Sequence, residues 1–203
     1  ESVYVDCDVE EPNGFLFLKP RNIETTRVSQ PVPVIDDAKC TGCGKCAEIC
    51  QYRAIVVLDD SPMVFEDLCH ACGGCKLVCP VGAISEKPRE IGSIQSGERG
   101  GMKAIEGRLD IGRVMSPPLI REVKRRMPSD GTTIIDSPPG TSCPVMTSLQ
   151  GADYVVLVTE PTPFGLNDIK LAVDAVGVLG IPCGVVINRA DIGTGETVSF
   201  LST

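Results

Sequence analysis

The sequence predicts an α/β protein in which a small cysteine-rich domain interrupts a parallel-sheet domain. Apolar runs of strand length alternate with helical patterns, which is typical of βαβ units and a doubly wound parallel sheet. Eight of the 11 cysteines fall between residues 40 and 79, and proline-containing connectors flank this region at 30–35 and 87–89. We therefore expect a discontinuous host domain of residues 1–35 and 90–203, with an inserted domain of residues 36–89.

In the host domain the first expected strand begins at Val3 and ends in acidic residues. After the insertion we expect strands at 90–96 and 102–110, joined by a glycine-rich turn, and a helix from Ser116 to about Met127. Further along, the pattern predicts a strand at 132–136, a helix at 144–150, a fully buried strand at 154–159, a helix that ends at Gly180, and a strand at 184–188.

The inserted domain contains the cysteine pattern C-x2-C-x2-C-x3-C twice, with an offset of 29 residues between the copies. Three thiolates on a tight loop can hold three corners of an iron–sulfur cube, while the fourth cysteine starts a helix that points away. In the bacterial two-cluster arrangement the fourth corner comes from the other copy. The predicted ligands of one [4Fe-4S] cluster are Cys40, Cys43, Cys46 and Cys79, and those of the other are Cys69, Cys72, Cys75 and Cys50.

Other uses of these cysteines fit the pattern less well. Four ligands satisfy a tetrahedral zinc ion, so two such runs supply too many for a zinc ribbon. A disulfide framework needs an oxidising compartment, and no apolar signal segment is expected at the start of the chain. This stretch closely resembles the bacterial two-[4Fe-4S] ferredoxins. It departs from them at Gln51, where the second copy has Pro80.

Composition limits the classes of partner. The formal charge is −8, which makes nucleic acid an unfavourable partner. Without an apolar run of about 18 residues, no membrane span is expected. The many cysteines and the absence of an expected secretory signal favour a reducing cytoplasm.

In the host domain, polar residues follow three expected strands: Asp6 and Asp8, then Asp136 with the loop to Gly140, then Asn188 with Arg189 and Asp191. A carboxylate at the end of an apolar strand can hold Mg²⁺ through water, and Gly140 would let a backbone N–H approach a γ-phosphate. The alternative is that such residues only close turns.

These segments resemble the MinD/ParA-like P-loop ATPases, within that family the members that carry an inserted two-cluster ferredoxin domain. The matching segments are DCDVEEPN at 6–13, IDSPPGTSCP at 135–144, VTEPTPFG at 158–165 and VINRAD at 186–191. The resemblance implies that Asp8 lies near the attacking water and that Asp136 is the Walker B carboxylate. It also implies that Gly140 senses the γ-phosphate, that Asn188 and Asp191 belong to the nucleotide site, and that ATP with Mg²⁺ is bound, commonly between two copies of the chain.

Two departures from this family matter. Its Walker A loop should stand before Val3, and no GxxxxGK[ST] occurs in the chain. The segment from Thr194 onward also fits poorly. We therefore expect a partial sequence that does not hydrolyse ATP by itself, although the complete protein would bind and hydrolyse it.

Three functions are compatible with these patterns. The first is ATP-gated electron transfer by the two clusters to a redox protein. The second is an iron–sulfur carrier or scaffold ATPase that serves an acceptor protein. The third is a simple ferredoxin-type electron carrier with a degenerate ATPase shell.

Overall fold

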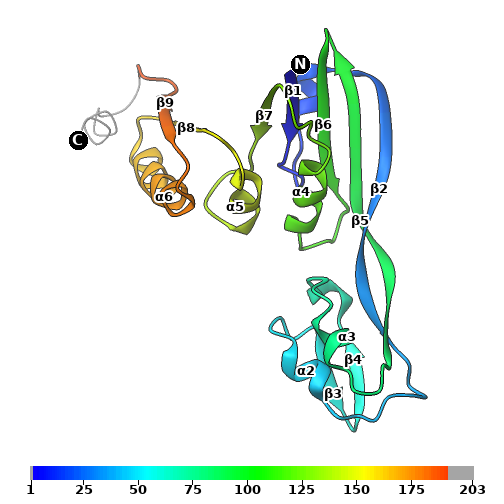
Figure 1. Cartoon of the computed structure of the whole chain (residues 1–203). Helices are drawn as coiled ribbons and strands as arrows, with labels where there is room; N and C mark the ends of the chain where they lie inside the picture. The colour runs from blue at the N-terminus through cyan, green and yellow to red at the C-terminus, as the bar shows by residue number, and fades with distance from the viewer. Residues whose placement is uncertain (1, 192–203) are drawn as a thin grey trace.

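The computed structural model describes residues 2–191, so the expected poor fit from Thr194 onward lies outside the described residues. The chain folds into nine strands and six α-helices within that range (Figure 1). The strands are β1 Ser2–Asp6, β2 Arg21–Ile35, β3 Ile55–Leu58, β4 Ser61–Val64, β5 Ile84–Arg99, β6 Met102–Leu109, β7 Thr132–Asp136, β8 Val155–Thr159 and β9 Cys183–Ile187. The helices are α1 Gly14–Leu18, α2 Lys45–Ile49, α3 Gly74–Val78, α4 Pro117–Lys124, α5 Cys143–Leu149 and α6 Pro163–Leu179, with a 3-10 turn, η1, at Glu66–Leu68.

The central sheet is mixed, with the strand order β2-β5-β6-β1-β7. β1 lies between β6 and β7 and pairs in parallel with both, as the α/β prediction requires. β5 and β6 form an antiparallel hairpin, because only two glycines, Gly100 and Gly101, connect them and a parallel pair needs a longer crossover. The predicted parallel pairing is therefore confirmed for β6, β1 and β7. The other half of the sheet, formed by β2, β5 and β6, is antiparallel.

The side chains of β1 alternate between the two faces of the sheet, and a helix packs against each face. Val3 and Val5 are buried on the face that packs against Leu119 and Ile120 of α4. Tyr4 points to the opposite face, where α1 approaches so closely that a Cβ on Gly14 would lie 2.4 Å from the tyrosine ring. The packing of α4 on one face and α1 on the other holds the carboxyl end of β1 in place.

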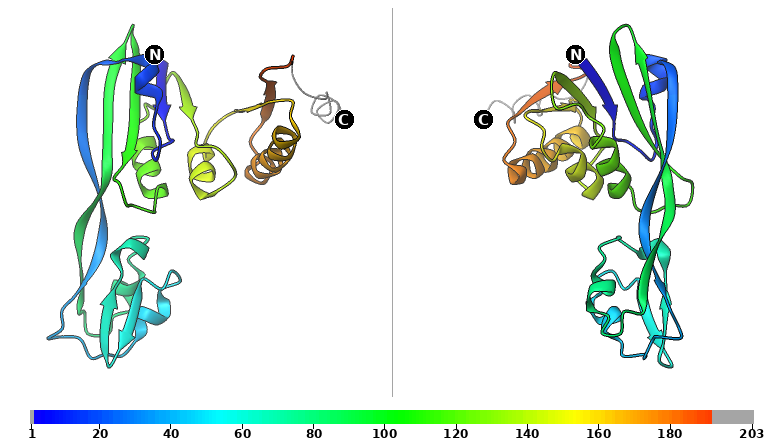
Figure 2. Two further views of the ribbon diagram at one scale, coloured as in Figure 1. Left: turned by 180° about the vertical axis from the view of Figure 1, so that it is seen from behind. Right: turned by 45° about the vertical axis from the view of Figure 1, so that its right-hand side comes forward.

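Beyond the sheet, the paired segments 29–35 of β2 and 84–90 of β5 form a twisted two-stranded neck, which carries the cysteine-rich module at its far end (Figures 1 and 2). The proline-containing segments predicted to be connectors are thus strands, which corrects the prediction. Prolines are tolerated in the neck because each neck strand has one free edge, where a missing N–H breaks no ladder. Pro31 lies opposite Pro88, and the register of the two strands shifts between Val28 and Ser29.

β8 and β9 form a separate two-stranded parallel sheet. The prediction of a fully buried strand at 154–159 is wrong, because Val156 and Val158 are 59% and 66% exposed. β8 has only β9 beside it in the described part of the chain and packs mainly on α6, so only its alternate residues are covered. α6 ends as predicted, with Gly180 in the left-handed conformation at its C-cap. Within residues 2–191 no helix has the length and apolarity to cross a membrane.

Candidate metal centres

The two cysteine motifs fold into the same local structure. Each begins with a loop that contains residues in the left-handed conformation, and Gly44 and Gly73, with φ of 77° and 71°, are the N-caps of α2 and α3. The fourth cysteine of each motif is the C-cap of its helix, Cys50 after α2 and Cys79 after α3. It therefore ends a helix, and the expectation that it starts one is wrong. Because each helix has only five residues, the fourth cysteine is carried away from the first three and toward the other motif.

Two cavities result, and each is lined by four cysteines in the combination that the spacing predicts. The first cavity is lined by Cys40, Cys43, Cys46 and Cys79, together with apolar side chains that include Ile35, Val57, Pro62 and Ile84. The second is lined by Cys69, Cys72, Cys75 and Cys50, with Pro31, Ile49, Tyr52 and His70 among its other residues. The structure therefore brings together three cysteines from one motif with the fourth from the other in both cavities.

Backbone N–H groups point at the sulfurs that cross over. The amide of Ala54 lies 3.3 Å from the Sγ of Cys50, and the amide of Ala83 lies 3.2 Å from the Sγ of Cys79. The hydrogen bond from Ala83 is the largest cause that lowers the pKa of Cys79. Amide donors of this kind favour the thiolate form, which is the form that binds iron.

Burial has the opposite effect on other cysteines of these sites. It raises the pKa of Cys46, Cys69 and Cys75, since an unpaired thiolate is poorly solvated there. Iron would offset that cost with its positive charge. In the described part of the chain, no three His, Cys, Asp or Glu side chains are arranged to hold a single metal ion. The donor set of four sulfurs around each cavity fits a [4Fe-4S] cluster.

The host domain brings two of the three predicted polar strand ends together. Asp6 of β1 and Asp136 of β7 are register partners, and the amide of Cys7 donates to the carbonyl of Asp136 at 2.8 Å. Asp6 is buried and accepts hydrogen bonds from the amides of Asp8, Asn13 and Gly14, at 2.9 to 3.2 Å. Burial is the largest cause that raises the pKa of both Asp6 and Asp8.

The third strand end lies elsewhere. Asn188 follows β9, which pairs with β8 and not with the central sheet, and the Asn188 Oδ1 accepts the amide of Arg189 at 3.0 Å. Asn188 and Asp191 are exposed. The expected convergence of all three strand ends is therefore wrong, because β9 does not pair with the central sheet. Gly140 has a φ of +90°, and a Cβ there would meet no described heavy atom within 4 Å, which leaves the loop after Asp136 open to a ligand.

Comparisons with known proteins identify the family and the module. Residues 33–85 match the family described as "4Fe-4S dicluster domain". Uncharacterized protein MJ0579 of Methanocaldococcus jannaschii is 31% identical over 195 residues, which are 95% of this chain and 70% of that protein. Uncharacterized protein MJ0578 of the same organism is 33% identical over 191 residues, 92% of this chain and 67% of that protein. The chain belongs to the family of these two proteins. It contains a 4Fe-4S dicluster domain, whereas none of these matches bears on a P-loop ATPase.

Sequence reasoning missed two host residues beside the strand-end carboxylates. The Tyr4 hydroxyl donates to Asp136 Oδ2 at 2.5 Å, and Glu106, 1% exposed, accepts the amide of Phe15 at 3.0 Å. Tyr4 alternates with Val3 and Val5 along β1, and that alternation was the available signal that its side chain faces the opposite side of the sheet. Glu106 carried no signal, because its burial depends on α1 packing over β6.

Proposed function

We propose that this protein transfers electrons by means of two [4Fe-4S] clusters, one in each cysteine cavity. The observation that carries the proposal is the crossed lining of both cavities, with three cysteines from one motif and the fourth from the other. A [4Fe-4S] cluster supplies reversible one-electron redox chemistry when it is bound. The dicluster-domain match over residues 33–85 supports the same conclusion.

The residues around the cysteines have distinct roles in this proposal. The eight thiolates hold iron, and the amides of Ala54 and Ala83 stabilise negative charge on the crossing sulfurs. Apolar side chains such as Val57 and Ile84 limit the access of water to the first cavity. Hydrogen bonds to sulfur and solvent exposure are two of the factors by which a protein sets cluster potential.

A redox titration of the anaerobically reconstituted protein tests this function. We expect the absorbance of the clusters to bleach on reduction with dithionite and to return on reoxidation without loss of iron. A carrier or scaffold predicts something different, namely transfer of iron and sulfide to an apo-ferredoxin faster than a chelator removes them. Rapid transfer of that kind, with irreversible bleaching, would replace electron transfer by the carrier function.

A finer proposal is that ATP gates the electron transfer. Its support is the position of Asp136 at the carboxyl end of β7 and of Asp8 in the segment just after the adjacent parallel strand β1, at the edge where ligands of α/β sheets bind. Mg²⁺ would bridge these carboxylates and the phosphates, because the carboxylates alone repel a nucleotide with about four negative charges. Gly140 would offer its backbone N–H to the terminal phosphate.

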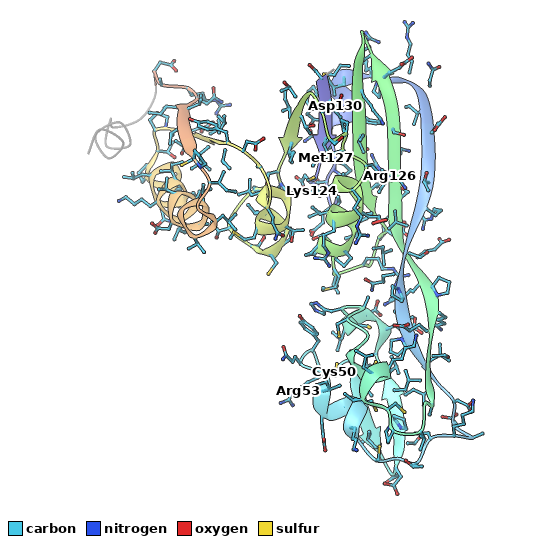
Figure 3. All side chains as sticks on the ribbon, viewed as in Figure 1. Cys50, Arg53, Lys124, Arg126, Met127 and Asp130 are labelled. Atoms are coloured by element: carbon cyan, nitrogen blue, oxygen red, sulfur yellow. The ribbon has the colours of Figure 1, made fainter. Side chains whose placement is uncertain are left out.

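The test of gating compares rates of reoxidation with and without Mg-ATP. We expect Mg-ATP to change the rate for the complete protein, which is expected to bind the nucleotide, and to have no effect on its Asp136→Ala variant. Asp130→Ala is the matched control, because Asp130 is an exposed carboxylate in the loop before β7, on the side of α4 away from the module (Figure 3). Rates that are indifferent to Mg-ATP would leave a simple two-cluster electron carrier as the function.

A further inference from the structure

The two cysteine sites differ in how they are attached to the rest of the protein. The 29-residue offset that superposes the motifs gives each residue near the second site a counterpart near the first. Three residues that make contacts at the second site have counterparts that cannot make the same contacts. Asp67 corresponds to Ala38, His70 to Thr41, and Tyr52 to Val81.

Asp67 lies in η1, just before the second cysteine loop, and it has two cationic partners. Arg89 of the neck donates to Asp67 Oδ1, and Arg113 of the host domain lies 3.4 Å from the same oxygen. The Arg89 side chain is 12% exposed and also lies 3.6 Å from Glu66, which pairs with Lys87 at 2.8 Å. The hydrogen bond from Arg89 is the largest cause that lowers the pKa of Asp67.

The neck also holds the second cysteine loop at Cys69, which is one of the predicted cluster ligands. Gln30 is the cross-strand partner of Arg89, and its Nε2 donates to the carbonyl oxygen of Cys69 at 3.2 Å. Beside this contact, the rings of Tyr52 and His70 stack with centroids 3.2 Å apart and an interplanar angle of 8°. The stack joins the segment after Cys50 to the segment after Cys69. Cys50 and Cys69 line the same cavity.

The first loop is held differently, by contacts inside its own module. Lys39 pairs with Asp36 three residues away, and a Cβ on Gly42 would lie 2.5 Å from the carbonyl of Asp60. Across residues 2–191, no ion pair or side-chain hydrogen bond joins segment 37–46 to the neck or to the host domain. In Figures 1 and 2 the tip of the module lies far from the host sheet, while the segment between β4 and α3 is its nearest part.

We propose that Asp67, held between Arg89 and Arg113, positions the second cysteine site against the host domain, so that the second site and not the first moves with the host. This inference rests on the proposed function and deepens it: a change of conformation in the host domain reaches the Cys50, Cys69, Cys72 and Cys75 site. Within the described chain, Arg113 is the host-body residue that forms an ion pair with this network, since Gln30 and Arg89 lie in the neck and Arg121 of α4 acts on His70 only through its charge. Loss of Arg113 should therefore weaken the attachment of the second site to the host domain.

Hydrogen–deuterium exchange of the reconstituted holoprotein tests the network in Arg113→Gln and Arg113→Lys. The matched control is Glu90→Gln, which removes a comparable exposed ion pair, Arg27–Glu90 at 2.8 Å, at the base of the neck. We expect Arg113→Gln to speed exchange in segment 66–72 by roughly two- to fivefold, because an exposed ion pair contributes little free energy. Exchange in segment 37–43 stays unchanged, Arg113→Lys restores the wild-type rate, and Glu90→Gln alters neither segment.

Cluster spectra give a second readout, which a role in global stability would not move. We expect the electron paramagnetic resonance signal and midpoint potential of one cluster to change in Arg113→Gln while those of the other stay constant. The cluster that changes should be the one that Cys75→Ala removes. Equal changes at both clusters, or unchanged exchange in segment 66–72, would overturn the inference. A protein that fails to take up iron at all would instead overturn the proposed function.

Discussion

Single residues on the α1 face of the sheet show how the host domain tolerates polar groups in its interior. Asp6 and Glu106 are each 1% exposed, and both accept hydrogen bonds from the backbone amides at the start of α1. Arg108 lies 3.0 Å from Glu106. Backbone donors offset part of the cost of burying a carboxylate, and these contacts fix the loop after β1 to the sheet.

The buried thiol of Cys7 makes stability depend on alkaline pH. Burial raises the pKa of Cys7 to about 12, so the folded protein keeps the thiol neutral while the thiol of the unfolded chain ionises at about pH 8.5. The stabilisation is therefore complete below that pH and is lost as the pH rises toward 12. In denaturant titrations between about pH 9 and 11, we expect the wild type to lose about 1.4 kcal/mol more per pH unit than Cys7→Ala. Parallel curves for the two proteins would show that Cys7 ionises equally in both states.

The glycines of this protein differ in how much space surrounds them. Gly107 of β6 lies under α4, where a Cβ would meet both Val123 and Val9 at 2.6 Å. Gly177 lies inside α6 with open space around it. The same substitution should therefore have opposite effects at these two positions.

Gly107→Ala should destabilise the protein and Gly177→Ala should stabilise it. Overpacking a core contact costs about 1 to 3 kcal/mol, whereas replacing glycine by alanine in an open helix position gains about 0.5 to 1 kcal/mol. Thermal unfolding of both variants beside the wild type measures the difference. A neutral Gly107→Ala would mean that α4 moves freely away from β6.

The helices α2 and α3 carry the crossing cysteines, so ligand variants test the crossing directly. We expect Cys50→Ala to damage the cluster of Cys69, Cys72 and Cys75, and Cys79→Ala to damage the cluster of Cys40, Cys43 and Cys46. Electron paramagnetic resonance compares each variant with Cys75→Ala and Cys46→Ala. If Cys50→Ala resembles Cys46→Ala, the crossed assignment is wrong.

The elements also show which signals a sequence carries. The strand at 132–136 and the end of α6 at Gly180 were predicted because an apolar run and a left-handed glycine are local features. The neck was missed because Pro31 and Pro33 argue against a strand unless its free edge is known. β8 was predicted to be buried, and its exposure depends on the strands beside it, which the local pattern does not contain.

At the scale of the whole molecule, the cysteine cavities could be predicted and their attachment could not. The C-x2-C-x2-C-x3-C spacing fixes each loop locally, and the second copy supplies the fourth ligand at short range. Arg113 and Asp67 are 46 residues apart and meet only because the neck returns the module to the host domain. Likewise, Asp6 and Asp136 meet through the pairing of β1 with β7. The chain's resemblance to a P-loop ATPase thus remains a prediction about the host, while the dicluster domain is shown.

Analysis of iron and acid-labile sulfide in the anaerobically purified protein tests the central claim, that the chain holds two [4Fe-4S] clusters. Two clusters predict about eight iron atoms and about eight sulfides per chain, and Cys75→Ala should retain about four of each. A wild-type content of about four of each, or iron without sulfide, would contradict the claim.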